Sequence, residues 1–290
     1  MERTAFNLDT LLKKHENQIN KIKILLNSKN IKDKIEDSIL IRYVLSYGDK
    51  LEEAAHSIEK AISWRNTNIY PLLKNKKISF KDDNIIFPIR IKPYYSFIRK
   101  ALAACEHKKT LDKQPIVLGR LKLCNFTLLL DNVPESILID YIVYSNEHEF
   151  SACNEQTKKK NLLCRTFRFI DLKGFMLKKF DRRFLRVFAN TSKLSEFLHP
   201  QLVGKTYLIN APSYIRITIE TLKTFGISRR TLNKLEIPKD IPSYLGGNCK
   251  CKNGCIPGFD NDLEDPLDIN PEEIKNEINN NLLKLNMDSS

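Results

Sequence analysis

The cysteines near the C-terminal end are the residues best spaced for metal chemistry. Cys249, Cys251 and Cys255 form a C-x-C-x₃-C pattern, and thiolates at this spacing could bind a zinc ion. A structural zinc site needs a full tetrahedral set of protein ligands, and these thiolates are an incomplete set. We therefore favour reduced structural cysteines over a zinc site, and we predict neither a metal nor a cofactor.

Histidines and acidic residues also stand close together further along the chain. His148 lies between Glu147 and Glu149, and His199 precedes a proline. Neither histidine has a cysteine or serine motif beside it, and the G-x-S-x-G, P-loop and H-E-x-x-H patterns are absent. Because an isolated histidine usually has a structural role, we expect no enzymatic activity.

Basic residues outnumber acidic residues in this chain of 290 residues. There are 48 lysines and arginines against 35 aspartates and glutamates, and the formal net charge is +13. Residues 258–290 contain nine acids and two bases, so this tail carries −7 and residues 1–257 carry +20. A basic body favours anionic partners, which include nucleic acid, acidic lipid headgroups and phosphorylated ligands.

Hydropathy and cysteine usage indicate the compartment. The chain has no apolar run long enough for a membrane-spanning helix, and its first residues lack the apolar core of a signal peptide. Its seven cysteines are an odd number, so we expect reduced thiols and an intracellular protein.

Hydrophobic periodicity predicts the elements that position these side chains. In the first 75 residues apolar side chains recur every three or four positions, which predicts amphipathic helices. Alternating runs predict strands at residues 114–121, 166–172, 205–210 and 232–237. Helical patterns occupy residues 128–145, 175–197 and 214–225, and the lysines at 158–160 indicate an exposed turn. This alternation predicts βαβ units and a mainly parallel sheet.

Four segments, in order along the chain, resemble motifs of the CRAL-TRIO family, also called Sec-fourteen-like lipid-transfer proteins. Residues 38–65 resemble its N-terminal helical module, which has an L-x-R-F/Y helix and a closing Trp-Arg. The other three are residues 171–174 (DLKG), 199–212 (HPQLVGKTYLINAP) and 242–247 (PSYLGG). The resemblance covers roughly residues 35–247, which is most of the chain.

The resemblance implies an α/β fold in which a helical module packs on a lipid-binding domain. We expect the helical module at residues 1–75, the lipid-binding domain at 85–250 and an acidic tail at 251–290. The domain would have a mainly parallel sheet as the floor of a hydrophobic lipid pocket, covered by a mobile gating helix. A helix that starts near Pro271 is expected to dock on the body.

The residues that the resemblance implies for lipid contact match only in part. The Arg-Lys pair with which the family binds phosphatidylinositol aligns with Tyr47 and Gly48, and is therefore missing. A glutamate of the same site aligns with Gln201, whose amide can still bond to hydroxyls, and its lysine has Lys234 as the nearest match. The strand floor would be apolar, with side chains from Phe167, Phe169, Tyr207 and Ile209.

Two further positions align with the hydroxyl residues with which the family binds phosphatidylcholine. Thr166 keeps the hydroxyl, whereas the second position is Arg168. A guanidinium inside a lipid pocket would require an anionic partner such as a phosphate or a carboxylate. Alternatively, Arg168 pairs with a buried acid or lies on the outer face of the sheet, and the residues do not decide between these hypotheses.

The predicted gate lies in residues 221–234 and mixes apolar and basic side chains. Leu222, Phe225, Ile227 and Leu232 would cover the lipid, and Gly226 could act as a hinge. Lys223, Arg229 and Arg230 would dock on an anionic membrane surface. The competing interpretation is a solvated helix with a core stripe.

Together these features predict a protein that encloses a single phospholipid or other lipophile. It would transfer or present this lipid between intracellular membranes, in the manner of a phosphatidylinositol/phosphatidylcholine transfer protein. We expect a cytoplasmic monomer that associates peripherally with membranes and does not bind nucleic acid. The alternative is a basic nucleic-acid-binding or protein-interaction module without lipid, although helix-turn-helix, zinc-finger and RRM signatures are absent.

Overall fold

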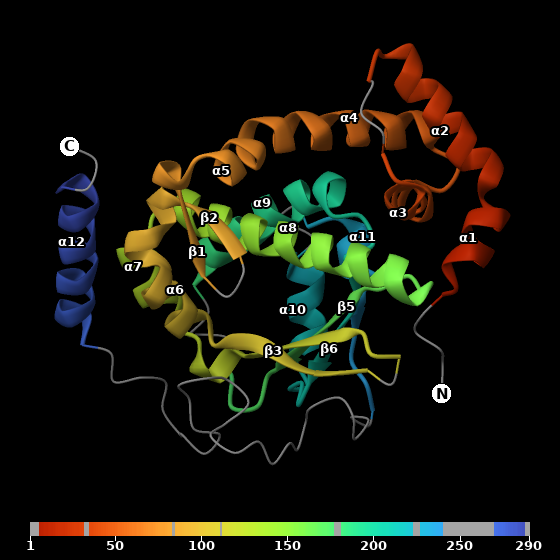
Figure 1. Ribbon diagram of the computed structural model, residues 1–290. Coiled ribbons are helices and arrows are strands. Elements are labelled where there is room, and N and C mark those ends of the chain that lie inside the picture. Colours follow the sequence, from red (N-terminus) through yellow and green to blue (C-terminus); the bar gives the residue numbers. More distant parts are fainter. Residues whose placement is uncertain are drawn as a thin grey trace.

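The structure is a computed structural model of the whole chain (Figure 1). It describes residues 6–31, 35–82, 85–110, 112–176, 181–222, 227–239 and 270–287, and the statements below concern these residues. Among them, no helix is both long enough and apolar enough to cross a membrane.

The N-terminal part is helical, as the periodicity predicts. It comprises α1 (Leu8–Lys14), α2 (Glu16–Ser28), α3 (Asp37–Tyr47), α4 (Leu51–Asn68) and α5 (Tyr70–Lys74). The apolar stripes of the first four helices form one buried cluster, to which Leu163 contributes from the other part of the chain. The helical module is therefore packed against the α/β part through a shared core.

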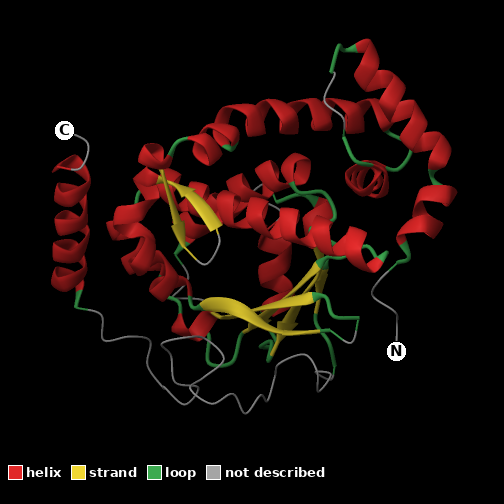
Figure 2. Cartoon of the chain, viewed as in Figure 1, coloured by secondary structure: helices red, strands yellow, loops and turns green. Residues whose placement is uncertain are grey.

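A five-stranded sheet forms the base of the α/β part (Figure 2). Its strands, in spatial order, are β3 (Ala104–Lys109), β4 (Pro115–Arg120), β5 (Thr166–Asp171), β6 (Val203–Ile209) and β7 (Leu235–Glu236). Strands β4 to β7 are parallel, and β3 is an antiparallel edge strand. The prediction of a mainly parallel sheet is confirmed, although the sequence pattern did not reveal β3.

Helices connect and cover these strands. They are α6 (Tyr95–Leu102), α7 (Phe126–Asn132), α8 (Glu135–Lys160), α9 (Arg182–Leu198), α10 (Ile215–Leu222) and α11 (Arg229–Leu232), with a 3₁₀ turn at η3 (Leu121–Leu123). The lysines at 158–160 form the last turn of α8 rather than a loop, where their charges suit the helix C-terminus. Helix α9 starts later than predicted, because the Asp181 side chain caps it by accepting from the Arg183 amide.

A small hairpin joins the two parts and was not predicted. It consists of β1 (Ser79–Asp82) and β2 (Ile85–Pro88), flanked by η1 (Lys76–Ile78) and η2 (Ile89–Tyr94). Phe80 and Phe87 of the hairpin pack their rings against Tyr95 of α6, with centroids 5.3–5.4 Å apart. Four-residue strands are too short to show a clear alternation, which explains why periodicity did not reveal them.

The arrangement is layered. Figure 1 shows α8 and α9 on one side of the sheet, with α4 beyond them. The C-terminal helix α12 (Pro271–Met287) packs Ile274 and Ile278 into a cluster with Phe97 and Leu129. The predicted tail helix is thus present and docked on the body.

Candidate lipid-binding site

The two faces of the sheet differ in chemistry, because successive side chains of a strand point to opposite sides. One face, here called the aromatic face, consists of Ile116, Leu118, Phe167, Phe169, Tyr207 and Ile209. The other, here called the helix face, consists of Val117, Arg168, Ile170, Thr206 and Leu208. Arg168 contacts α8, which places the helix face toward the covering helices.

This alternation separates residues that we predicted to line one wall. Tyr207 stacks on Phe169 with ring centroids 4.8 Å apart, on the aromatic face. Phe167 and Phe169 are 2% and 0% exposed, so their rings are buried, whereas Tyr207 on the same face is half-buried. A single cavity cannot be lined by both Tyr207 and Arg168, because their side chains point to opposite faces of the sheet.

A bulge in β6 sets the register between these faces. Thr166 pairs with Val203 and Arg168 pairs with Thr206, so β6 contains one more residue than β5 across this interval. Gly204 lies in the bulge, where a Cβ atom would come within 3.0 Å of the Phe167 ring. Glycine is therefore required by the close approach of an aromatic ring.

The helix face keeps accessible surface although helices cover it. Val117, Arg168, Ile170 and Thr206 are all only half-buried. Its side chains change character along the strands: Arg168 lies near the amino end of β5, and Ile170 lies near the carboxyl end. Apolar side chains continue from there onto α10, in a cluster that contains Leu172, Leu208, Ile215 and Ile219.

The gate residues occupy different environments. Ile227 and Leu232 are buried in a cluster with Ala189 of α9, so both lie against the helix that covers the sheet. Leu222 ends α10, and its side chain lies outside the described residues, as do Lys223, Phe225 and Gly226. The predicted cysteine motif at 249, 251 and 255 also lies outside them.

Thr166 and Arg168 are held by α8. Thr166 is fully buried, with its hydroxyl 3.7 Å from the Cys153 thiol. Arg168 donates to the Asn146 amide oxygen at 2.9 Å and lies 3.4 Å from a Glu149 carboxylate oxygen. The hypothesis that Arg168 pairs with an acidic side chain is confirmed. The guanidinium of Arg168 lies on the helix face of the sheet.

Gln201 lies at a turn between α9 and β6 that is fixed by α3. Its backbone has a left-handed φ of +56°, and its carbonyl accepts from Arg42 at 3.2 Å. Its side-chain amide donates to the Ser46 hydroxyl of α3 at 3.2 Å. The side chain thus points toward the part of α3 that also carries Tyr47.

Arg42 of the L-x-R-Y motif ties α3 to the α/β part. Its guanidinium is fully buried and also donates to the Thr157 hydroxyl at 2.8 Å and to the Cys164 carbonyl at 2.9 Å. The adjacent Tyr43 donates its hydroxyl to the Phe197 carbonyl at 2.7 Å. The motif therefore acts as an anchor between the two parts.

Arg65 of the Trp-Arg motif is a second anchor. It donates to both carboxylate oxygens of Glu147, at 2.6 and 3.1 Å, and to the Leu198 carbonyl at 2.7 Å. His199 completes the group with an Nε2–carboxylate distance of 2.9 Å. Burial raises the pKa of Glu147, but hydrogen bonds from His199 and Arg65 outweigh burial and lower that pKa to about 2.

The DLKG and INAP motifs hold the carboxyl ends of two strands. The Asp171 carboxylate accepts from the Lys173 amide at 2.9 Å and from the Asn210 side chain at 2.8 Å. Asn210 has a left-handed φ of +51°, a conformation that asparagine tolerates better than most residues. These motif residues thus stabilise turns rather than present reactive groups.

Basic side chains gather at the amino ends of the strands, around Lys234. Burial, together with the positive charges of Arg165, Arg168 and Arg230, lowers the pKa of Lys234 to about 8. Arg230 lies over the ring of Tyr47 at 4.5 Å, whereas Arg229 is exposed. Arg230 is thus directed toward α3 and Arg229 toward solvent, and their docking on a membrane stays a prediction.

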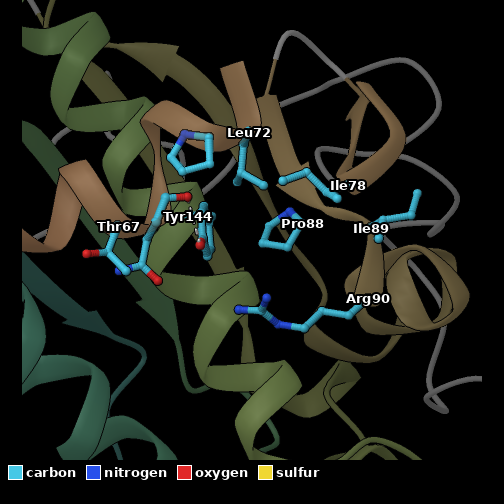
Figure 3. Close-up of a pocket in the computed structure, with 9 residues that line it drawn as sticks. Thr67, Leu72, Ile78, Pro88, Ile89, Arg90 and Tyr144 are labelled. Atoms are coloured by element: carbon cyan, nitrogen blue, oxygen red, sulfur yellow. Dashed lines mark hydrogen bonds between the residues drawn. The ribbon is translucent and has the colours of Figure 1, made fainter. Parts of the chain in front are cut away.

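A separate hollow of about 310 Å³ lies between α5, η2 and α8 (Figure 3). Leu72, Pro88 and Tyr144 line it, and Arg90 lies at its rim in the close-up. This volume is at the lower end of the range for small-ligand pockets. The hollow contains none of the predicted lipid contacts.

The structure combines a helical module, which two arginines anchor, with a mainly parallel sheet whose helix face keeps accessible surface beneath the covering helices. This combination defines a Sec14-like α/β protein. The CRAL/TRIO domain matches residues 99–248, which is just over half of the chain. The chain belongs to the CRAL/TRIO domain family.

Relatives and a solved structure agree with this assignment. The chain is 23% identical to the phosphatidylinositol/phosphatidylcholine transfer protein SFH11 of Arabidopsis thaliana, over 85% of this chain and 69% of that protein. It is 24% identical to the Sec14 cytosolic factor of Schizosaccharomyces pombe, over 77% of this chain and 78% of that protein. The crystal structure of Sfh5 shares the fold, with a TM-score of 0.50 and 12% identity over 98% of this chain and 99% of that chain.

Proposed function

We propose that this protein binds one phospholipid between the helix face of the sheet and helices α9 and α10, and transfers or presents it between membranes. The observation that carries the proposal is the polarity of the helix face. On the helix face Arg168 lies near the amino end of β5, whereas Ile170 and Leu208 lie toward the carboxyl ends; Gln201 and Lys234 precede the amino ends of β6 and β7. An amphiphile bound along the strands would match both ends.

The physical reason for enclosure is the cost of exposing acyl chains. Each methylene that leaves an apolar environment costs about 0.8 kcal/mol, so a carrier must cover the whole chain during transfer. Ile219 of α10 packs both with the helix-face cluster and with α9. Outward movement of α10 would open the apolar end of the site, which supports a gating role for this helix.

Family membership supports the same function. Relatives in the CRAL/TRIO family have names that state phosphatidylinositol/phosphatidylcholine transfer. We infer a non-enzymatic carrier with a phospholipid as its ligand and no metal or other cofactor. We further propose a cytosolic monomer that associates peripherally with anionic membranes through Lys223 and Arg229.

Mass spectrometry of organic extracts from native protein tests lipid binding directly, and the expected result is a stoichiometric phospholipid. Ile170→Trp should fill the helix face and lower the transfer of labelled phospholipid between vesicles at least about tenfold. Ile24→Trp is the matched control, because Ile24 is 68% exposed on α2 and its substitution should leave transfer unchanged. Protein without bound lipid that is retained on DNA at low salt would overturn the proposal in favour of a nucleic-acid-binding module.

A further inference from the structure

Two cysteine thiols meet where the end of α8 lies beside the start of β5. The Sγ atoms of Cys153, on α8, and Cys164, two residues before β5, lie 3.9 Å apart, and each residue is 2% exposed. A disulfide bond joins sulfur atoms about 2.05 Å apart, so the thiols need to approach by only about 2 Å. Both cysteines pack with Phe150 and Leu202 in one buried cluster, which holds their side chains in place.

One threonine fixes the backbone on both sides of this contact. The Thr157 hydroxyl donates to the Cys153 carbonyl at 2.8 Å and accepts from the Cys164 amide at 2.9 Å. Asn161 ends α8 between them with a left-handed φ of +51°. Arg42 donates to the same hydroxyl at 2.8 Å and to the Cys164 carbonyl at 2.9 Å. The two thiols are therefore positioned by a network of hydrogen bonds.

The buried charge of Arg42 favours a negatively charged sulfur nearby. Its hydrogen bonds go to the Gln201 carbonyl, the Thr157 hydroxyl and the Cys164 carbonyl, which are all neutral groups. Among the residues that the structure describes, no carboxylate pairs with it, and its Nε–H has no hydrogen-bond acceptor. Because a buried cation is costly without a counter-charge, a thiolate at Cys164 is stabilised by Arg42.

The two thiols differ in acidity. The contact with Cys153, together with the positive charges of Arg42, Lys160 and Arg165, lowers the pKa of the Cys164 thiol to about 7, although burial opposes this shift. The pKa of Cys153 is raised by its contact with Cys164 and by burial. Since the thiolate is the reactive form, Cys164 is the nucleophile of the pair and Cys153 is the thiol that closes the disulfide.

Cys124 provides a contrast within the same chain. Its thiol donates to the Leu102 carbonyl at 3.0 Å, and burial raises its pKa to about 12. A thiol with this pKa stays protonated at neutral pH and reacts slowly with oxidants. Burial of a cysteine alone therefore does not make it reactive in this protein.

We propose that Cys153 and Cys164 are an oxidation site that forms a reversible disulfide on exposure to a peroxide. The Cys164 thiolate attacks one oxygen of hydrogen peroxide, the O–O bond breaks, and the departing hydroxide takes up the proton that the thiol released. The Cys153 thiol then attacks the sulfur of the resulting sulfenic acid, the S–O bond breaks, and water leaves with the thiol proton. The two thiols lose two electrons, and the peroxide is reduced to two molecules of water.

Peptide mapping of the full chain after treatment with hydrogen peroxide tests the proposal. Trypsin cuts after the lysines at 158–160, so Cys164 lies in the peptide 161–165 and Cys153 in the peptide 123–158. The expected result in the wild type is a cross-link between these two peptides that dithiothreitol removes. Absence of this cross-link would overturn the proposal, and the wild-type result does not depend on whether any variant folds.

A matched control identifies the cysteine that is linked to Cys164. Cys124 lies in the same tryptic peptide as Cys153. The yield of the cross-link should be unchanged in Cys124→Ala and should fall at least about tenfold in Cys153→Ala, because only the latter removes the thiol in contact with Cys164. The reverse pattern would overturn the proposal.

Trapping with dimedone, which reacts with sulfenic acids, tests the two roles. In Cys153→Ala the peptide 161–165 should carry the adduct after peroxide treatment, because the sulfenic acid at Cys164 has no thiol to close on. An adduct on the peptide 123–158 in Cys164→Ala would overturn the assignment of Cys164 as the nucleophile. The oxidised wild type should also unfold at a higher urea concentration than the reduced protein, since the bond constrains the unfolded chain. Unfolding at a lower concentration would contradict the fit of the disulfide to this fold.

Discussion

Two pairs of buried basic residues in this protein have opposite situations. Arg42 and Arg65 donate to carbonyl, hydroxyl and carboxylate oxygens that surround them. Arg230 and Lys234 are half-buried, and no hydrogen bond or ion pair joins their side chains to the described residues. The first pair joins the helical module to the α/β part, whereas the second pair makes no such link within the part of the chain that the structure describes. Burial of a positively charged side chain alone therefore does not reveal its role. The oxygen atoms that accept hydrogen bonds from the side chain reveal it.

The largest expected loss of stability comes from disrupting the contacts of the first pair, Arg42 and Arg65. Glu147→Gln removes the charge that pairs with Arg65, and breaking one side of a buried ion pair costs about 3–5 kcal/mol of the free energy of unfolding. Urea denaturation would measure this loss. Glu53→Gln is the control, because its ion pair with Lys50 is exposed and should contribute at most about 1 kcal/mol. Equal losses in the two variants would contradict the anchoring role of Arg65.

Acid should weaken the same anchor. The pKa of Glu147 in the folded protein is about 2, below its ordinary value of 4.5, so the stabilisation is present above pH 4.5 and disappears as the pH falls toward 2. Thermal unfolding between these pH values should show a steeper loss of stability in the wild type than in Glu147→Gln. Parallel curves would show that this carboxylate does not contribute to the acid response.

The charge on Lys234 should have the opposite effect on the fold: the charged lysine destabilises it, whereas the charged Glu147 carboxylate stabilises it, and in both cases stability rises with pH. The pKa of Lys234 is lowered by burial and then by Arg165, Arg168 and Arg230, while Glu196 opposes this shift. A lowered lysine pKa destabilises the folded, lipid-free protein below pH 8, and this penalty disappears as the pH rises from about 8 to 10.5.

Lys234→Met should therefore stabilise the lipid-free protein at pH 7, by about 1–3 kcal/mol. The same variant should lose affinity for an anionic headgroup. Urea denaturation at pH 7 and at pH 10, together with vesicle extraction, measures both effects. A variant less stable than the wild type at pH 7 would place Lys234 with the anchoring arginines instead.

Substitution of a solvent-exposed base should have the smallest effect on the free energy of unfolding. Arg90 pairs with Asp140 at 2.7 Å, but its side chain is about half exposed. Arg90→Gln should change the free energy of unfolding by less than about 1 kcal/mol. A larger loss of the free energy of unfolding, measured by thermal denaturation, would mean that the exposure of a base does not predict how much its removal destabilises this protein.

Sequence reasoning predicted the helical module and the parallel strands, because their periodicity is strong and local. It did not predict the partners of Arg42 and Arg65, since Arg42 and Gln201 are 159 residues apart and Arg65 and Glu147 are 82 apart. Tyr207 was assigned to the pocket because strand patterns show that side chains alternate but not which face is covered. The alignment showed that the Arg-Lys pair was missing at Tyr47 and Gly48. It did not show that Arg230 of the short helix α11 places a guanidinium over Tyr47.

The long separation between Arg42 and Gln201 has a consequence during synthesis. Helix α3 leaves the ribosome 159 residues before the carbonyl that accepts from Arg42. At typical elongation rates of about 5–20 residues per second, this interval lasts about 8–30 s. Throughout that time the anchor is incomplete, and the helical module must hold α3 through its own core, to which only Leu163 is later added from the α/β part.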